Sequence, residues 1–105
     1  MLNKIRLLLE YNTYCVWLLD ENDEIIDNDN PPELIDDQEL TDAFMAISDL
    51  YDTFFVDTSS EFRYVGCPDD KTKEDLISLI DKAVDLLEKK TNGKYIIENK
   101  IDTNF

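Results

Sequence analysis

Short apolar runs separated by polar breaks fill the first part of the chain. Residues 4–10 (KIRLLLE) and 14–20 (YCVWLLD) are two such runs, and the polar residues 12–13 between them are typical of a turn. The second run leads through residues 21–24 (ENDE) into a further apolar pair in residues 25–27 (IID). The pattern predicts two strands and then a third that forms a hairpin with the second, with an acidic four-residue tip on that hairpin.

Two longer segments carry apolar residues at spacings of three and four, which is the period of one helix face. The first segment, residues 37–53, has its stripe at Leu40, Phe44, Ile47, Tyr51 and, just beyond the end, Phe54. Asp36 or Asp37 can cap its start, where a carboxylate meets the positive end of the helix dipole. The second segment, residues 71–91, ends before an Asn-Gly pair (92–93) typical of a helix stop. Its broader stripe, typical of a helix packed on a sheet, consists of Leu76, Ile77, Leu79, Ile80, Ala83, Val84, Leu86 and Leu87.

The remaining segments connect these elements or extend the sheet. Residues 28–32 (NDNPP) can continue neither a strand nor a helix, because proline lacks the N–H donor and restricts the residue before it. Aromatic and β-branched residues in 54–57 and 61–67 flank a hydroxyl-rich turn at 58–60 (TSS), which predicts a second hairpin. Residues 94–98 predict a last strand, so the expected order is β-β-β-α-β-β-α-β.

Length and composition favour a single domain. A chain of 105 residues closes around one hydrophobic core, and an apolar content of 43% is too high for a disordered acidic chain. Only two glycines and three prolines interrupt the sequence, so most of the chain should form regular structure. We therefore expect a single acidic α+β domain over residues 1–105, with antiparallel hairpins and two helices packed on a sheet.

The charge is strongly negative and unevenly distributed. Residues 7–70 contain 18 acidic residues and one basic residue, Arg63, which gives a local balance of −17 within a net charge of −15. Such a field repels nucleic acid and anionic lipid, and it accelerates association with basic proteins by roughly 10- to 1000-fold. We expect a basic protein partner, and neither a nucleic acid nor a membrane.

The side chains that most enzymes use are absent or isolated. The chain has no histidine, which removes the group best suited to proton transfer at neutral pH and the commonest nitrogen ligand of metals. Cys15 and Cys67 lie 52 positions apart without a second cysteine nearby, so we interpret both as small buried apolar side chains. We predict that the protein is not an enzyme.

The acidic segment begins like a calcium-binding loop but does not complete the pattern. Asp20, Asn22 and Glu24 alternate as the first ligands of such a loop do, but the sixth position is Ile25 and the twelfth is Pro31. Those positions require glycine and glutamate. We therefore expect neither a metal site nor a cofactor.

The chain contains no sign of a membrane segment. No apolar run approaches the roughly 18 to 20 residues of a spanning helix, and no small-residue cleavage site follows the apolar stretch near the start. The expectation is a cytoplasmic protein.

Acidic residues are densest between Asp20 and Asp42, where 11 of 23 residues are acidic and none is basic. A solvated surface that keeps the protein soluble is the simpler explanation. However, like charges at this density destabilise a compact state, and half as many would maintain solubility. We therefore interpret the stretch as a binding face, with candidate partner-binding carboxylates at Asp20, Glu21, Asp23, Glu24, Asp27, Asp29, Asp36 and Asp37.

Aromatic residues are candidate anchors for the same interaction. Most of them should lie in the core, but buried rings beside an acidic rim are the composition of a tight protein interface. We select Tyr64 and Tyr11 as the candidate anchors.

Size, charge and element order together resemble the immunity proteins of bacterial toxin–immunity systems, including those of contact-dependent inhibition. The resemblance rests on residues 17–20 (WLLD), 25–27 (IID) and 31–34 (PPEL), in an acidic chain of this length. It implies a cytoplasmic antidote that binds one cognate toxin domain, often a nuclease, and occludes its active site. Such a toxin has a basic cleft for phosphates, which an acidic surface would complement.

Two other functions fit the same sequence. A DNA-mimic inhibitor, of the anti-restriction type, would use its carboxylates in place of phosphates and would bind several nucleic-acid-binding proteins. An adaptor domain within a larger complex would combine the charge with an exposed apolar patch.

Overall fold

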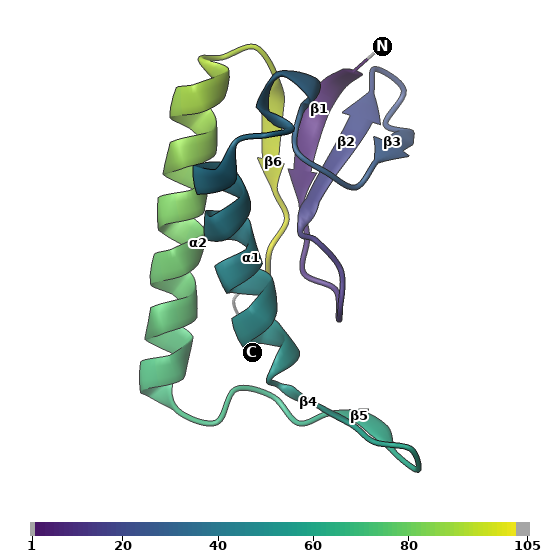
Figure 1. The fold of residues 1–105 in the computed structure, drawn as a ribbon, viewed down its shortest axis with the longest axis vertical. Helices are drawn as coiled ribbons and strands as arrows, with labels where there is room; N and C mark the ends of the chain where they lie inside the picture. Colours follow the sequence, from purple (N-terminus) through teal and green to yellow (C-terminus); the bar gives the residue numbers. More distant parts are fainter. Residues whose placement is uncertain (1, 103–105) are drawn as a thin grey trace.

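The computed structural model describes residues 2–102 and confirms the predicted α+β class and element order (Figure 1). The elements are β1 (Leu2–Leu7), β2 (Val16–Asp20), β3 (Ile25–Asp27), the 3₁₀ turn η1 (Pro32–Leu34), α1 (Gln38–Asp52), β4 (Phe55–Asp57), β5 (Phe62–Tyr64), α2 (Asp70–Thr91) and β6 (Ile96–Asn99). The first strand was expected over residues 4–10. The observed strand, β1, covers Leu2–Leu7, so it begins and ends earlier.

The main sheet has four strands in the order β3-β2-β1-β6. β1, β2 and β3 pair antiparallel, as the hairpin pattern predicts. β6 pairs parallel to β1, with Ile5 opposite Ile97, so the sheet is mixed rather than built from antiparallel hairpins alone. A parallel neighbour needs a long crossover, and here everything between β1 and β6 supplies it.

Both helices cover the same face of this sheet, and the core lies between them and the strands (Figure 1). The buried apolar residues include Ile5, Leu7, Val16, Leu18, Leu40, Phe44, Ile47, Leu76, Ile80, Ala83 and Leu87. This set includes residues of both predicted helix stripes: Leu40, Phe44 and Ile47 of the first, and Leu76, Ile80, Ala83 and Leu87 of the second. We call the opposite, helix-free side of the sheet the open face.

The helix ends follow the expected capping chemistry. Asp37 caps α1 by accepting a hydrogen bond from the Leu40 N–H, and Asp69 caps α2 by accepting one from the Thr72 N–H. Asn92 ends α2 in the left-handed region at φ 48°, a conformation that asparagine tolerates better than most residues.

The second predicted hairpin exists but does not join the main sheet. β4 and β5 pair only with each other, and residues 55–64 project from the end of α1 as a narrow arm (Figure 1). We call this segment the arm. It lies at the opposite end of the 41 Å long axis from the β2–β3 turn.

Candidate partner-binding surface

The acidic tip between β2 and β3 is a structured turn. The Asp20 carboxylate accepts hydrogen bonds from the backbone N–H groups of Asn22 (2.8 Å) and Glu24 (3.0 Å), while the Glu24 carbonyl accepts from the Asp20 N–H (3.0 Å). Aspartate commonly folds its own turn in this way. One oxygen of Asp20, Oδ1, accepts both of the side-chain hydrogen bonds in the tip.

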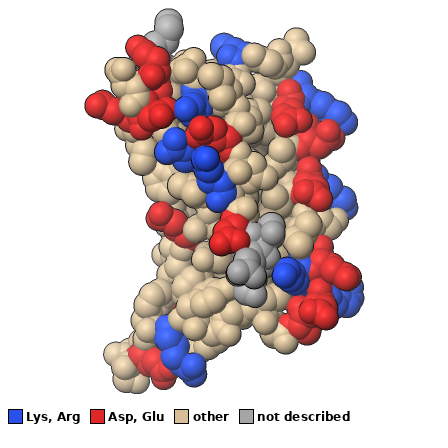
Figure 2. Space-filling model, turned by 180° about the vertical axis from the view of Figure 1, so that it is seen from behind, with Lys and Arg blue, Asp and Glu red and all other residues tan. Residues whose placement is uncertain are grey.

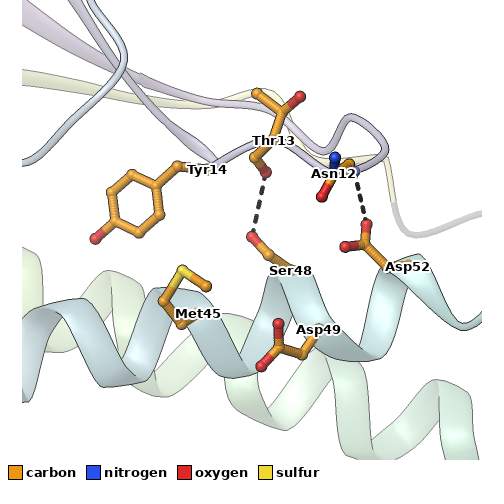
Figure 3. Close-up of a pocket in the computed structure, with 7 residues that line it drawn as sticks. All are labelled: Asn12, Thr13, Tyr14, Met45, Ser48, Asp49 and Asp52. Atoms are coloured by element: carbon orange, nitrogen blue, oxygen red, sulfur yellow. Dashed lines mark hydrogen bonds between the residues drawn. The ribbon is translucent and has the colours of Figure 1, made fainter.

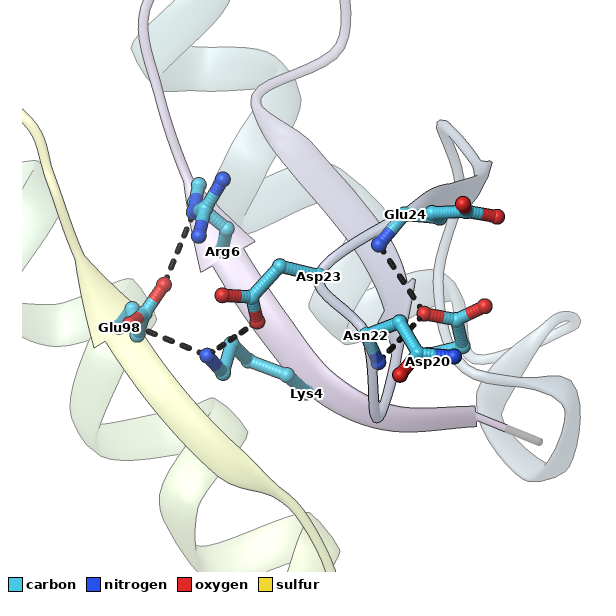
Figure 4. Close-up of polar contacts among 7 residues, drawn as sticks. All are labelled: Lys4, Arg6, Asp20, Asn22, Asp23, Glu24 and Glu98. Atoms are coloured by element: carbon cyan, nitrogen blue, oxygen red, sulfur yellow. Dashed lines mark hydrogen bonds and ion pairs between the residues drawn. The ribbon is translucent and has the colours of Figure 1, made fainter.

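Asp23 is tied to the open face by an ion-pair network (Figure 4). Its carboxylate lies 2.6 Å from Lys4 Nζ, and Lys4 also lies 3.4 Å from Glu98, which accepts a 2.8 Å hydrogen bond from Arg6. The hydrogen bond from Lys4 lowers the pKa of Asp23, and that from Arg6 lowers the pKa of Glu98. Charges of both signs are accordingly intermixed over the upper part of the surface in Figure 2.

Asp37 also has a structural role, in joining the two helices. Besides capping α1, its carboxylate lies 2.9 Å from Lys90 of α2, which in turn lies 3.0 Å from Glu39. The Lys90 hydrogen bond lowers the pKa of Asp37. Asp29 accepts a 2.7 Å hydrogen bond from the Asn30 N–H in the connector.

The remaining predicted residues do not form one surface with Tyr64. Glu21, Glu24, Asp27 and Asp36 have exposed side chains. The first three belong to the β2–β3 hairpin, whereas Tyr64 lies on the arm at the other end of the molecule (Figure 1). Partner binding by these carboxylates stays a prediction, and any face that includes Tyr64 must be built from other neighbours.

Those neighbours are aromatic. The β4–β5 register places Phe55 opposite Tyr64 and Asp57 opposite Phe62, so all four side chains share one face of the arm. Phe55 stacks on Phe62 at 5.7 Å between ring centroids and meets Tyr64 edge-on at 5.1 Å. Tyr11, from the β1–β2 loop, lies 4.7 Å from Phe55 and 5.0 Å from Phe62. We call Tyr11, Phe55, Phe62 and Tyr64 the aromatic surface.

This surface is both anchored and exposed. The Phe55 ring contacts Tyr51 of α1 at 5.3 Å, and the Tyr11 hydroxyl donates a 2.9 Å hydrogen bond to Asp57, which raises the pKa of Tyr11. Phe62 is nevertheless 58% exposed and Tyr64 48% exposed. Rings held in place by one another and left open to solvent are typical of a binding site.

Two carboxylates lie beside the aromatic surface. Asp57 belongs to the arm and accepts the hydrogen bond from Tyr11, and Asp52 ends α1 just before the arm. Arg63 points to the other face of β5 and donates a hydrogen bond to Glu61. We call Asp52 and Asp57 the acidic rim of the aromatic surface, and Arg63 is paired with Glu61 on the opposite face.

Sequence reasoning selected Tyr11 and Tyr64 but missed Phe55 and Phe62. The signal was partial, because Phe62 and Tyr64 are two apart in a strand and so share a face. The predicted turn at 58–60 would place Phe55 opposite Arg63, whereas the observed turn spans 58–61 and places Phe55 opposite Tyr64. That the arm would stand away from the sheet, and so leave these rings exposed, could not be read from the same pattern.

Only one of the two cysteines is fully buried as predicted. Cys15 is buried, and burial raises the pKa of its thiol to about 11. Cys67 is partly buried, and both thiols are free. Within residues 2–102, no three carboxylate or thiol side chains converge in an arrangement that could hold a metal ion.

Comparisons of the chain with protein families, with curated proteins and with solved structures found no match. Among the helices of residues 2–102, none has the length and apolar character required to cross a membrane.

Proposed function

We propose that this protein binds a basic protein partner and neutralises it, as an immunity protein binds its toxin, with the arm as the main contact. The observation that carries the proposal is the aromatic surface, whose Phe62 and Tyr64 rings are exposed on a projecting hairpin with Asp52 and Asp57 close by. The resemblance of the sequence to immunity proteins suggests a toxin domain, and the charge suggests a nuclease with a basic cleft.

The aromatic surface supplies the affinity. Phe62 and Tyr64 each expose about half of their side chains, and their rings are already held by Phe55 and Tyr11. A partner that covers them gains apolar burial without first ordering flexible side chains. Aromatic residues in this position commonly contribute about 2 kcal/mol or more each to binding.

The acidic rim supplies the choice of partner. Asp52 and Asp57 would face a basic surface favourably and would repel an acidic one. A two-stranded ribbon, with its strands roughly 5 Å apart, is narrow enough to enter a cleft. An arm seated in the substrate cleft of a nuclease would block the phosphate backbone from entering.

The test begins with identification of the partner by capture from the native host, followed by expression of that partner alone. The proposal requires that the captured protein is basic, that it is toxic by itself, and that co-expression of the wild-type protein restores growth. The double variant Phe62→Ala, Tyr64→Ala should bind with a Kd raised roughly 1,000-fold and should fail to restore growth.

The matched control is the double variant Ile25→Ala, Ile26→Ala. These side chains are 62% and 52% exposed, on β3 at the other end of the molecule, so the control removes exposed apolar surface without touching the arm. Equal binding by both double variants and the wild type would rule out the arm as the contact. Capture of many nucleic-acid-binding proteins, all released together by salt, would instead indicate a DNA mimic.

A further inference from the structure

A small cavity lies at the base of the arm, between the β1–β2 loop and the second half of α1 (Figure 3). Its volume is about 110 Å³, and its lining residues are Asn12, Thr13, Tyr14, Met45, Ser48, Asp49 and Asp52. Figure 3 shows Tyr14 and Met45 at one end of the lining and Asn12 and Asp52 at the other.

The walls of the cavity are fixed by their own contacts. The Asn12 N–H donates to Asp52 Oδ1 at 2.9 Å, and Ser48 Oγ donates to the Thr13 carbonyl at 3.3 Å, so the loop is fastened to α1 at two points. The Tyr14 hydroxyl donates to Asn30 at 2.6 Å, which holds the Tyr14 ring in place. The cavity therefore exists without a ligand to shape it.

Its size decides what class of ligand fits. Cofactors and drug-sized ligands occupy pockets of about 300 to 1,000 Å³, several times the 110 Å³ of this one. A single side chain of another protein is a better match.

Its chemistry favours a cationic side chain. Within residues 2–102, the Asp49 carboxylate has no hydrogen-bond or ion-pair partner, and Asp52 uses only Oδ1, for the Asn12 N–H. Met45 and the Tyr14 ring add apolar wall beside these acceptors. Guanidinium groups suit such a mixture, because they present several N–H donors in one plane, stack on apolar and aromatic groups, and are weakly hydrated.

The cavity and the aromatic surface are built from residues adjacent in the chain. Tyr11, a member of that surface, directly precedes Asn12, and Tyr51, which supports Phe55, directly precedes Asp52. We propose that the cavity receives an arginine side chain of the partner that docks on the arm. This inference rests on the proposed function, because the arginine is taken to belong to the proposed partner. The cavity itself can be tested without the partner.

The first experiment uses ethylguanidinium as the probe and amide NMR shifts of the full-length protein as the readout. We expect saturable shifts at Asn12, Thr13 and Asp49, with millimolar affinity because the probe is small. Asp49→Asn should abolish saturation without disturbing the fold, since the Asp49 side chain is exposed and has no hydrogen-bond or ion-pair partner within residues 2–102.

The matched control is Asp81→Asn, which removes the same charge from an exposed position on α2, away from the cavity. It should leave the shifts saturable and unchanged. Shifts that never saturate, or that persist in Asp49→Asn, would mean that the probe is only a counterion of the acidic surface, and the inference would be overturned.

The second experiment measures the Kd of the identified partner. Asp49→Asn should weaken binding by roughly tenfold to a hundredfold, the usual effect of losing a charge-assisted hydrogen bond. Asp81→Asn should change it by much less. If the probe binds the cavity but no toxic partner exists, the proposed function fails alone; if the partner binds through the arm and Asp49→Asn is neutral, the cavity inference fails alone.

Discussion

Asp36 and Asp37 are neighbours with identical side chains, yet only one of them holds the fold together. Asp37 caps α1 and pairs with Lys90, whereas Asp36 is exposed and no such contact joins it to α2. The sequence pattern allowed either residue as the cap, because the first turn of a helix can begin one residue earlier or later at little cost. Only the position of Lys90, more than fifty residues away, distinguishes them.

This difference predicts unequal effects of the same substitution. Asp37→Ala should lower Tm by about 5 °C, since it removes a helix cap and an interhelical ion pair together. Asp36→Ala should leave Tm within about 2 °C of the wild type, as surface substitutions usually do. Thermal unfolding of both variants followed by circular dichroism tests this, and equal Tm values would contradict it.

Lys4 also stabilises the fold through ion pairs, on the open face of the sheet. Its side chain is only 14% exposed and lies between Asp23 and Glu98. Because these carboxyls have lower pKa values in the folded chain, their contacts stabilise the fold above the ordinary carboxyl pKa of about 4. That contribution is lost as pH falls through the lowered pKa.

Lys4→Met should therefore raise the pKa of Asp23 towards its ordinary value of about 3.9, while the methionine keeps most of the packing. A carboxyl-carbon NMR titration measures this directly. Lys71→Met is the matched control, because Lys71 is 84% exposed and its ion pair lies within α2. An Asp23 pKa that stays low in Lys4→Met would show that the ion pair is not its cause.

Among the elements, the arm is the one whose place in the fold was hardest to predict. The sequence indicated its two strands and turn, the helix limits and the polar connector, because capping residues, periodicity and proline act locally. It did not indicate that β4 and β5 avoid the main sheet, or that β6 pairs parallel with β1. Strand partners are chosen by contacts between segments distant in the sequence, which an alternating pattern cannot specify.

Strands of three residues, as in β4 and β5, are too short to be stable as an isolated hairpin. Phe55 provides the missing support, because its ring contacts Tyr11, Tyr51, Phe62 and Tyr64. Phe55→Ala should expose the arm's amides to hydrogen exchange at least about tenfold faster, with α2 still protected.

Val56→Ala is the control for this prediction, since Val56 is on the same strand but points to the opposite face, across from Arg63. It should leave exchange in the arm nearly unchanged. If Phe55→Ala instead unfolds the whole chain, the arm and the body form one cooperative unit, and the arm does not behave as a separate element.

On the scale of the whole molecule, the acidic residues divide into two groups. One group, which includes Asp20, Asp23 and Asp37, forms turns, caps and ion pairs that stabilise the fold. The other group, which includes Glu24 and Asp36, is exposed to solvent. The candidate site could therefore be predicted only in part: the sign of the field follows from composition, but the carboxylates that remain available depend on where the few cations lie. The long-range field survives this division, since the net charge of −15 is far from neutral.

The aromatic surface and the field should consequently control different rate constants. Neutralising Glu24, Asp36 and Asp42, which lie outside the arm, should slow association with the partner several-fold at low ionic strength and leave dissociation unchanged. The difference should vanish at about 0.5 M salt, where the Debye length falls to roughly 4 Å.

Phe62→Ala should do the opposite, with faster dissociation and a nearly normal association rate at every salt concentration. Stopped-flow measurements over a salt series separate the two effects, and an association rate insensitive to both charge and salt would leave the acidic surface with no role beyond solubility.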